Sequence, residues 1–277
     1  MKPIPEGTTV GELLRLDVLD ALERRILVSH ALGLSRIQLI TRSEQVLAPS
    51  EAHAVSVLLE RRLAGEPIAY IVGEREFYGL PFIVTPDVLI PRPETELLVE
   101  LALEKAPQQA SVLDMGTGSG AIAVAIAHAR TDLKVTALDQ SQPALQIAQR
   151  NAGRHKAAVR FLHSDWYCAL DDQRFDVIVS NPPYIVSGDV HLSQGDLRFE
   201  PADALTDHAD GLSSLRTIIE GAPAHLKSGG WLMMEHGYDQ AESVRDLLTQ
   251  AGFIDVQSWK DLASIERVSG GRLERSS

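Results

Sequence analysis

The tetrapeptide Asn181-Pro182-Pro183-Tyr184 follows the apolar run Phe175–Ser180 and contains residue types that can hold a planar NH2 group. Each proline fixes its own φ and favours an extended conformation in the residue before it, so the Asn181 oxygen and nearby carbonyl groups can point into one pocket. These oxygens could accept hydrogen bonds from the two N–H groups, while the planar NH2-bearing group lies against the flat ring of Tyr184. The same residues could instead form only a proline turn after a strand. The chemistry that they favour is methyl transfer onto nitrogen.

A glycine-rich loop lies upstream, between a predicted strand at 111–115 and a predicted helix at 121–129. Gly116, Gly118 and Gly120 permit positive φ and close approach of the backbone to a ligand. The next predicted strand, 134–138, is followed by Asp139, about 20 residues after the last glycine, where a carboxylate can accept bonds from both ribose hydroxyls. Hydride transfer does not require an Asn-Pro-Pro-Tyr sequence. We therefore expect S-adenosylmethionine as the cofactor, and not NAD.

Composition and charge are those of an ordinary globular enzyme. The chain has 277 residues, of which 44% are hydrophobic and 23% charged, and this length favours two domains. Cys168 is its single cysteine, and we find no leader or membrane-spanning run, so we expect a cytoplasmic protein without a membrane partner. The net charge of −12 argues against stable nucleic-acid binding. No His, Cys and Asp cluster has metal-ligand spacing, so we expect no metal.

The N-terminal part has apolar residues at three- and four-residue spacing, which predicts helices over 10–19, 21–32, 36–40 and 50–63. Such stripes are typical of a helical bundle core. The hydrophobic period then changes toward alternation over 69–72 and 77–84, with breaks at Gly79 and Pro81, which predicts a β-hairpin. We therefore assign residues 1–66 to a helical bundle that docks the substrate, 67–85 to a β-hairpin connector and 86–277 to the catalytic domain.

Helices and strands alternate through the catalytic domain. The predicted helices are 94–104, 121–129, 142–151, 212–225 and 239–251, and the predicted strands are 111–115, 134–138, 159–163, 175–180, 230–235, 254–258 and 265–273. This order predicts an α/β fold, a Rossmann-like, mostly parallel twisted sheet with helices on both faces and an antiparallel late strand. Ligands bind at the carboxyl ends of such strands. Asp114, Asp139, Asp165-Trp166 and Asn181 should therefore meet at one rim.

Further motifs along the chain are Glu66-Pro67-Ile68-Ala69-Tyr70, Gly73-Glu74-Arg75-Glu76-Phe77, Ile90-Pro91-Arg92-Pro93-Glu94-Thr95-Glu96, Ser164-Asp165-Trp166, Arg198-Phe199-Glu200-Pro201 and Glu235-His236-Gly237. With these motifs the chain resembles the HemK/PrmC family, the peptide chain release factor N5-glutamine methyltransferases, nearly from end to end. Similar Asn-Pro-Pro-Tyr sequences occur in methyltransferases that act on adenine N6 or guanine N2, so the helical N-terminal part and the connector motifs carry the resemblance. Ala263-Ser264 departs from the family pattern, in which a glycine is expected.

The resemblance implies a reaction and a set of partners. A methyl group would pass from S-adenosylmethionine to N5 of the glutamine in the Gly-Gly-Gln motif of bacterial class 1 release factors. An N-methyltransferase acting on an exocyclic amine of adenine or guanine in nucleic acid is the nearer alternative. A binding module that keeps the cofactor fold without catalysis is the more distant one.

The resemblance also implies a role for each site residue. Asp139 should hold the ribose, Trp166 should pack beside the adenine, and Asn181 should contact both cofactor and substrate. Asn181, Pro182 and Tyr184 are the expected catalytic residues. Arg92 and Glu96 could border the cofactor mouth or form a structural ion pair. The methionine end of the cofactor should be lined by Gly116, Thr117, Gly118, Ser119 and Gly120, and the substrate pocket by Asn181, Pro182, Pro183 and Tyr184.

Overall fold

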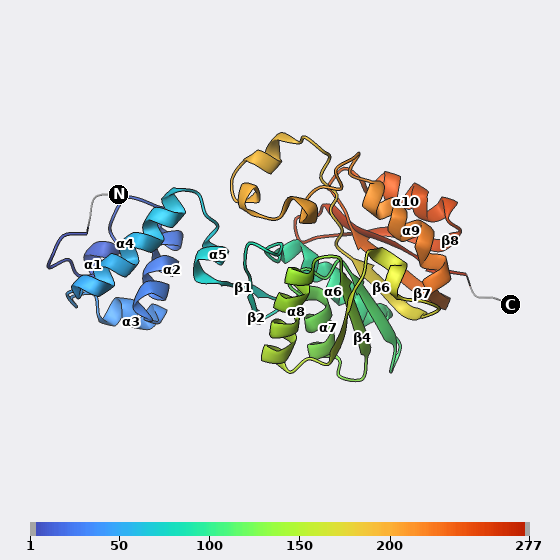
Figure 1. Cartoon of the computed structure of the whole chain (residues 1–277), viewed down its shortest axis with the longest axis horizontal. Helices are drawn as coiled ribbons and strands as arrows, with labels where there is room; N and C mark the ends of the chain where they lie inside the picture. The colour runs from blue at the N-terminus through green and yellow to red at the C-terminus, as the bar shows by residue number, and fades with distance from the viewer. Residues whose placement is uncertain (1–3, 275–277) are drawn as a thin grey trace. The chain divides into compact units, whose positions relative to one another are not determined.

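The structure is a computed structural model that describes residues 4–274. These residues divide into two units between Gly73 and Glu74, and short helices build the N-terminal unit. Hydroxyl and carboxylate side chains begin several of these helices; Asp20, for example, accepts from the N–H groups of Leu22 and Glu23. Their apolar faces enclose a core of their own. The helices, blue to cyan in Figure 1, are α1 (Val10–Leu13), α2 (Ala21–Leu32), α3 (Arg36–Thr41), α4 (Pro49–Leu63) and α5 (Ile68–Val72).

Two predictions for this part of the chain are wrong. The helix predicted over 10–19 ends at Leu13, and the first half of the predicted connector is the helix α5. Four to five apolar residues do not distinguish a period of two from a period of 3.6, and burial of Ile71 in the helical core selects the helix here. The predicted hairpin follows as β1 (Glu74–Phe77) and β2 (Leu80–Ile83), joined through positive φ at Tyr78 and Gly79.

The C-terminal unit is built on a sheet whose described strands run in the order β5-β4-β3-β6-β7-β9-β8. The first five are mutually parallel, and β9 is antiparallel to both of its neighbours, as predicted. The strands are β3 (Ser111–Met115), β4 (Lys134–Asp139), β5 (Val159–His163), β6 (Phe175–Ser180), β7 (Leu226–Glu235), β8 (Phe253–Lys260) and β9 (Glu266–Leu273).

Helices cover both faces of this sheet. Figure 1 shows α6 (Glu96–Lys105), α7 (Ala121–Ala129) and α8 (Gln142–His155) on one side and α9 (Ser213–His225) and α10 (Ala241–Gln250) on the other. Successive residues of β3 face opposite helix layers: Val112 packs with α6 and α7, and Leu113 packs with α9 and α10. Burial on both faces explains the continuous apolar runs of the central strands. None of the described helices has the length and apolar character needed to cross a membrane.

The loop between β8 and β9 contains the departure from the family pattern. Ser264 has a φ of 65°, in the left-handed region that favours glycine. Its N–H donates to the Asp261 carbonyl at 2.9 Å, which holds the turn closed. One of the two positions in this departure, Ser264, therefore has a backbone conformation that prefers glycine, and the serine adopts it with some strain.

Asn151, fully buried on α8, joins the hairpin to the glycine loop. Its Nδ2 donates to the Ile83 carbonyl at 3.0 Å and to the Ser119 carbonyl at 2.8 Å, while its Oδ1 accepts from the Ile83 N–H at 2.7 Å. One side chain thus satisfies three backbone groups from two segments that are distant in sequence. These bonds fix the start of α7 and the end of β2 against the same helix.

We expect Asn151→Ala to lower the free energy of unfolding by about 3 kcal/mol, because three backbone groups lose their partner in a buried environment. Urea denaturation measures this value. Gln149→Ala, an exposed change on the same helix, is the control and should alter stability by less than about 0.5 kcal/mol. A similar small effect of both substitutions would show that Asn151 does not hold the two segments.

Candidate active site

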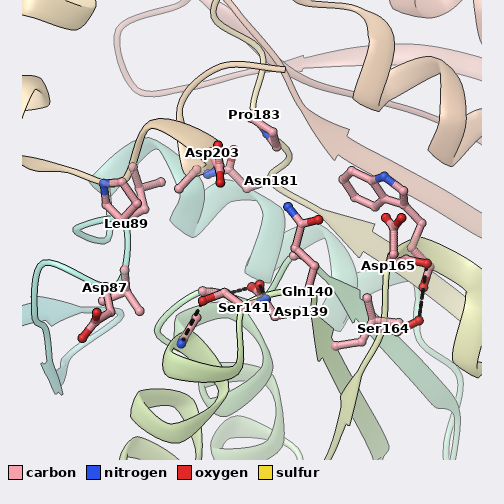
Figure 2. A pocket seen from close by; sticks show the side chains of 18 residues that line it. Asp87, Leu89, Asp139, Gln140, Ser141, Ser164, Asp165, Asn181, Pro183 and Asp203 are labelled. Carbon is pink, nitrogen blue, oxygen red and sulfur yellow. Dashed lines mark hydrogen bonds between the residues drawn. The ribbon is translucent and has the colours of Figure 1, made fainter. Parts of the chain in front are cut away.

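The carboxyl ends of β3, β4, β5 and β6 surround one cavity of about 440 Å³. Figure 2 shows Asp139, Asp165 and Asn181, which follow or end three different strands, around this space. Parallel strands bring their carboxyl ends to one edge, which is why residues so far apart in sequence meet here. Of the site and rim residues predicted from the sequence, those on the cavity wall are Gly116, Gly118, Asp139, Asp165, Trp166, Asn181 and Pro183.

The glycine loop uses its glycines in two ways. Gly116, Gly118 and Gly120 have φ values of 68°, 55° and 81°. A Cβ at either of the first two would meet no atom within 4 Å, so the backbone there stays open to a ligand. A Cβ at Gly120 would lie 3.0 Å from the Cβ of Ala148, so this glycine allows α7 to pack closely against α8.

Asp139 ties the loop to the end of β4. Its Oδ2 accepts from the Gly118 N–H and its Oδ1 from the Ser141 N–H, both at 2.8 Å. Burial raises the pKa of this carboxyl, and the two backbone donors oppose that effect. Each carboxylate oxygen keeps a second lone pair, so Asp139 can accept ribose hydroxyls while it holds the loop. Its predicted role as the ribose ligand is compatible with this geometry.

The cavity wall has the chemistry that S-adenosylmethionine requires. A volume of about 440 Å³ lies in the usual range for small-molecule sites. Asp139 supplies an acceptor for hydroxyl groups, Leu138 and Trp166 supply apolar surface for a base, and the loop supplies open backbone. The residues present therefore fit an elongated ligand with a sugar, a base and a charged end. Among residues 4–274 there is no cluster of His, Cys, Asp and Glu suited to a metal ion.

Other predicted residues lie behind this wall. The Thr117 hydroxyl donates to Asp114 Oδ2 at 2.6 Å, and the Ser119 carbonyl accepts from Asn151. The loop is therefore shaped from inside by Thr117, Ser119 and Gly120, none of which lines the cavity. Their predicted contact with the cofactor stays a prediction. Pro182 and Tyr184 also lie outside the wall. Their predicted roles with a substrate stay predictions.

The Asn-Pro-Pro-Tyr turn is held from two sides. The Nδ2 of Asn181 donates to Thr95 Oγ1 at 3.2 Å, and the Tyr184 hydroxyl donates to Glu235 Oε1 at 3.2 Å. Burial raises the pKa of Tyr184, whose ring packs against the core that contains α9 and α10. The Tyr184 carbonyl accepts from Gln240 Nε2 at 3.1 Å. This residue is thus fixed at its side chain and at its backbone.

Gly211 (φ 78°) lies against the Asn-Pro-Pro-Tyr turn, although no motif in the sequence includes it. A Cβ at this position would lie 2.6 Å from the Tyr184 carbonyl oxygen and 2.9 Å from Gln240 Nε2. The Tyr184 oxygen is a backbone atom, so it cannot move aside without shifting the turn, and a shift would also strain its bond to Gln240. A residue with a Cβ at position 211 would therefore have to displace this backbone and adopt a strained positive φ.

Glu200 links two segments of the cavity wall. Its side chain is fully buried, accepts from the Ile90 N–H at 3.0 Å and pairs with Arg92. Arg92 therefore does not pair with Glu96, which accepts from the Tyr78 N–H at 2.9 Å, and neither residue lines the cavity. Wall residues that sequence reasoning missed are Asp87, Val88, Leu89, Leu138, Gln140, Ser141, Ala144, Ser164, Pro201, Asp203 and Ala204.

Part of this missed set had a usable signal in the sequence. Gln140 and Ser141 directly follow Asp139 at the end of β4, where ligand contacts are expected. The short 3-10 helix η5 (Ala202–Ala204) directly follows the Arg198-Phe199-Glu200-Pro201 motif. This motif therefore indicated a segment that lines the cavity. Asp87 and Leu89 precede the Ile90-Pro91-Arg92 motif in the same way. Their approach to β4 depends on tertiary packing, for which the sequence has no local rule.

Asp114 was predicted at the rim of the cavity, and this prediction is wrong: the residue is fully buried under the glycine loop and does not line the cavity. Its Oδ2 accepts from Thr117 and from the Ala123 N–H at 3.2 Å, so it caps the loop and the start of α7. Its Oδ1 has no hydrogen-bond partner among the described residues. Burial raises the pKa of Asp114 to about 7, and the two hydrogen bonds counteract that rise. Ionising this residue therefore costs folding free energy.

We expect Asp114→Asn to remove a pH dependence of stability in the cofactor-free protein. The folded pKa of about 7 is above the ordinary value of an aspartate, 3.8, so the contribution of Asp114 is fully present below about pH 4 and declines as pH rises through 7. The difference corresponds to about 4 kcal/mol. Urea denaturation from pH 4 to 8 measures it as the difference between the two proteins. A difference that stays constant over this range would contradict the assignment.

Comparison with known proteins identifies both units. Residues 93–205 match the Methyltransferase small domain, and residues 16–73 match the PrmC N-terminal domain. A methyltransferase of Pyrococcus furiosus superposes with a TM-score of 0.56 at 20% identity, covering 79% of this chain and 99% of its own. A T. thermophilus 16S rRNA methyltransferase in complex with AdoMet and guanosine superposes with a TM-score of 0.54 at 23% identity, covering 73% of this chain and 50% of its own. These structures confirm the predicted fold.

Curated relatives of high identity cover nearly the whole chain. The release factor glutamine methyltransferase of Burkholderia pseudomallei is 59% identical over 97% of this chain and 98% of the relative. The protein of the same name from Bordetella pertussis is 54% identical over 96% of this chain and 100% of the relative. Identity of this extent includes both the helical unit and the sheet that carries the cavity. The chain therefore belongs to the family of release factor glutamine methyltransferases.

Proposed function

We propose that this protein transfers a methyl group from S-adenosylmethionine to the side-chain nitrogen N5 of the glutamine in the Gly-Gly-Gln motif of bacterial class 1 peptide chain release factors. One observation carries the proposal: Asn181 shares a cavity wall with the glycine loop and Asp139. An acceptor for amide N–H bonds thus stands beside a site that fits the methyl donor. The relatives' names support a release factor as substrate, and a cytoplasmic location fits that substrate.

The chemistry of the amide sets what the site must do. Conjugation, with a rotational barrier of about 18–20 kcal/mol, makes an amide nitrogen a poor nucleophile. Acceptors at Asn181 and Pro182 would hold both N–H bonds away from the line of attack and expose the lone pair. Each such hydrogen bond contributes about 1–3 kcal/mol, whereas orientation of the reacting groups can contribute about 7–11 kcal/mol. Bound S-adenosylmethionine supplies a methyl group activated by a sulfonium. Neutral Asn181 orients the amide and is not the final base.

We expect Asn181→Ala to lower kcat for release factor methylation by about 100-fold or more, because the amide loses the group that orients it. Cofactor affinity should change by less than about threefold. Labelled S-adenosylmethionine and mass spectrometry of the release factor measure the product, and calorimetry measures cofactor binding. Full activity of this variant would overturn the role of Asn181. Label that appears on RNA or DNA and not on the release factor would overturn the proposed substrate.

Asp139→Ala is the matched change on the cofactor side of the same cavity. It removes a charged acceptor and the ties to Gly118 and Ser141, so we expect cofactor affinity to fall by about 10- to 100-fold. Calorimetric titration with S-adenosylmethionine measures this loss. The two variants together separate cofactor binding from methyl transfer. If Asp139→Ala left the affinity for S-adenosylmethionine unchanged, the proposed role of Asp139 in cofactor binding would be wrong.

We further propose that the N-terminal unit docks the release factor. Its described residues include strongly exposed apolar side chains on neighbouring helices: Leu22 on α2 is 62% exposed, and Ile37 and Ile40 on α3 are 73% and 71% exposed. Ile37 and Ile40 are three residues apart on α3 and so share one face of that helix, and exposed apolar side chains that lie together are typical of surfaces that contact other proteins. The match of this unit to a family-specific N-terminal domain supports a role with the family's large substrate.

A double substitution, Ile37→Asp with Ile40→Asp, tests this docking role. We expect it to raise KM for the intact release factor by about tenfold, because two apolar contacts are replaced by charges. Methylation of a short Gly-Gly-Gln peptide should be unchanged. Leu262→Asp, on a fully exposed apolar residue of the C-terminal unit, is the control. Equal KM values for the double variant and the wild type would contradict the docking role of this surface.

A further inference from the structure

The segment that follows β7 has no role in the proposed reaction so far, although it begins with the motif Glu235-His236-Gly237. Because β7 is the parallel neighbour of β6, this motif emerges at the same edge of the sheet as the Asn-Pro-Pro-Tyr turn. His236 is fully buried, and Gly237 and Gln240 are half-buried. Gln240 stands directly before α10. The segment thus lies where it can support the turn from behind.

Gln240 connects this segment to the turn through both polar atoms of its side-chain amide. Its Oε1 accepts from the Gly237 N–H at 2.8 Å. Its Nε2 donates to the carbonyls of Tyr184 and Gly211, at 3.1 and 3.2 Å. Within the described part of the chain, this side chain makes no capping hydrogen bond to α10. The bonds of Gln240 therefore serve the turn and not the helix that follows it.

The partners leave the Gln240 amide one orientation. A backbone N–H group can only donate, so Oε1 must face Gly237. Backbone carbonyls can only accept, so Nε2 must face Tyr184 and Gly211. A reversed amide would lose all three bonds. A Cβ at Gly237 would lie 3.0 Å from Gln240 Oε1, so the glycine of the motif leaves room for this contact.

His236 fixes the backbone of Gly237. Its Nδ1 lies 2.8 Å from the Gly237 carbonyl oxygen, which also accepts from the Gln240 N–H at 3.1 Å. Because a carbonyl can only accept, the imidazole must carry a proton on Nδ1. Its Nε2 lies 2.7 Å from the Ser269 hydroxyl. Burial lowers the pKa of His236, which favours a neutral ring that accepts from Ser269. The ring is thus held at both nitrogen atoms.

The contact with Ser269 belongs to a chain of hydrogen bonds that reaches α10. Ser269 Oγ lies 2.6 Å from Ser258 Oγ, which accepts from Arg245 Nη1 at 2.7 Å. An arginine can only donate, so both hydroxyl protons of this chain can point toward His236. Networks in which each group has a partner hold a buried side chain in one position. The position of the imidazole is therefore fixed independently of Gly237.

We propose that Gln240 is a positioning residue that holds the Asn-Pro-Pro-Tyr turn in its catalytic shape, and that His236 holds Gln240 in place through the backbone of Gly237. This inference rests on the proposed function, which requires Asn181 and Pro182 to orient the substrate amide closely. Neither Gln240 nor His236 lines the cavity, so both act on the reaction through the turn.

Substitutions of Gln240 in the full-length protein test its role. Gln240→Met keeps the length of the side chain and removes its donors, and Gln240→Glu places a carboxylate against two carbonyl oxygens. We expect both to lower kcat for release factor methylation by about 10- to 100-fold, because the turn no longer holds Asn181 and Pro182 in line. The KM for the release factor and the affinity for S-adenosylmethionine should change by less than about threefold. Gln250→Met, on an exposed glutamine that ends α10, is the matched control and should leave kcat unchanged.

Two substitutions of His236 separate positioning from packing. His236→Asn and His236→Gln both remove the buried ring, so both should lower the melting temperature by a similar amount. The Asn side chain can place a nitrogen near the position of Nδ1 and donate to the Gly237 carbonyl, whereas the longer Gln side chain reaches toward Ser269. We therefore expect His236→Asn to retain kcat within about threefold and His236→Gln to lower it by about tenfold. The variants of half-buried Gln240 decide the proposal if a His236 variant does not fold.

The outcomes separate this inference from the proposed function. A wild type that methylates the release factor, together with unimpaired Gln240→Met and Gln240→Glu variants, overturns the role of Gln240 alone. Equal losses of kcat in folded His236→Asn and His236→Gln overturn the role of His236, because they would follow from lost packing. A folded wild type that binds S-adenosylmethionine and transfers no methyl group to the release factor overturns the proposed function, and this inference with it.

Discussion

One hydrogen bond, from the Gly118 N–H to the Asp139 carboxylate, joins the two strand ends on which the cavity depends. β3 and β4 are parallel neighbours, so the loop after β3 must turn back across the end of β4. Positive φ in the loop makes that turn possible, and the acid gives it a fixed endpoint. The same carboxylate then faces the cavity. Folding of the loop and recognition of a ligand are therefore two uses of one contact.

The parts of the fold that could be predicted are those governed by local rules. Strands buried on both faces have continuous apolar runs, and their ends identify Asp139 and Asn181 without any knowledge of tertiary structure. The short helix α5 was mispredicted because a few apolar residues suit either period. Thr95 and Glu235 were not predicted as partners of the turn, because the contact of Thr95 depends on how the segment before α6 packs and that of Glu235 on the pairing of β6 with β7, and no sequence spacing encodes either.

Asp114 and Glu235 show where the fold tolerates unfavourable burial. Each is enclosed, each has one oxygen without a partner among the described residues, and burial raises the pKa of each to about 7. One supports the glycine loop and the other supports the Asn-Pro-Pro-Tyr turn. Polar groups that cost stability persist where they fix a unique geometry. The two buried acids whose ionisation is unfavourable thus lie at the two loops whose shape the proposed chemistry requires.

Gly211 shows that the boundary of the active site in sequence differs from its boundary in space. A side chain there would collide with the Tyr184 carbonyl and with Gln240, although the residue belongs to no recognisable motif and offers no functional group. In a deep mutational scan scored by methylation, position 211 would be as intolerant as the Asn-Pro-Pro-Tyr sequence itself. An inventory of reactive side chains would overlook it, because what it contributes is the space that it leaves unfilled.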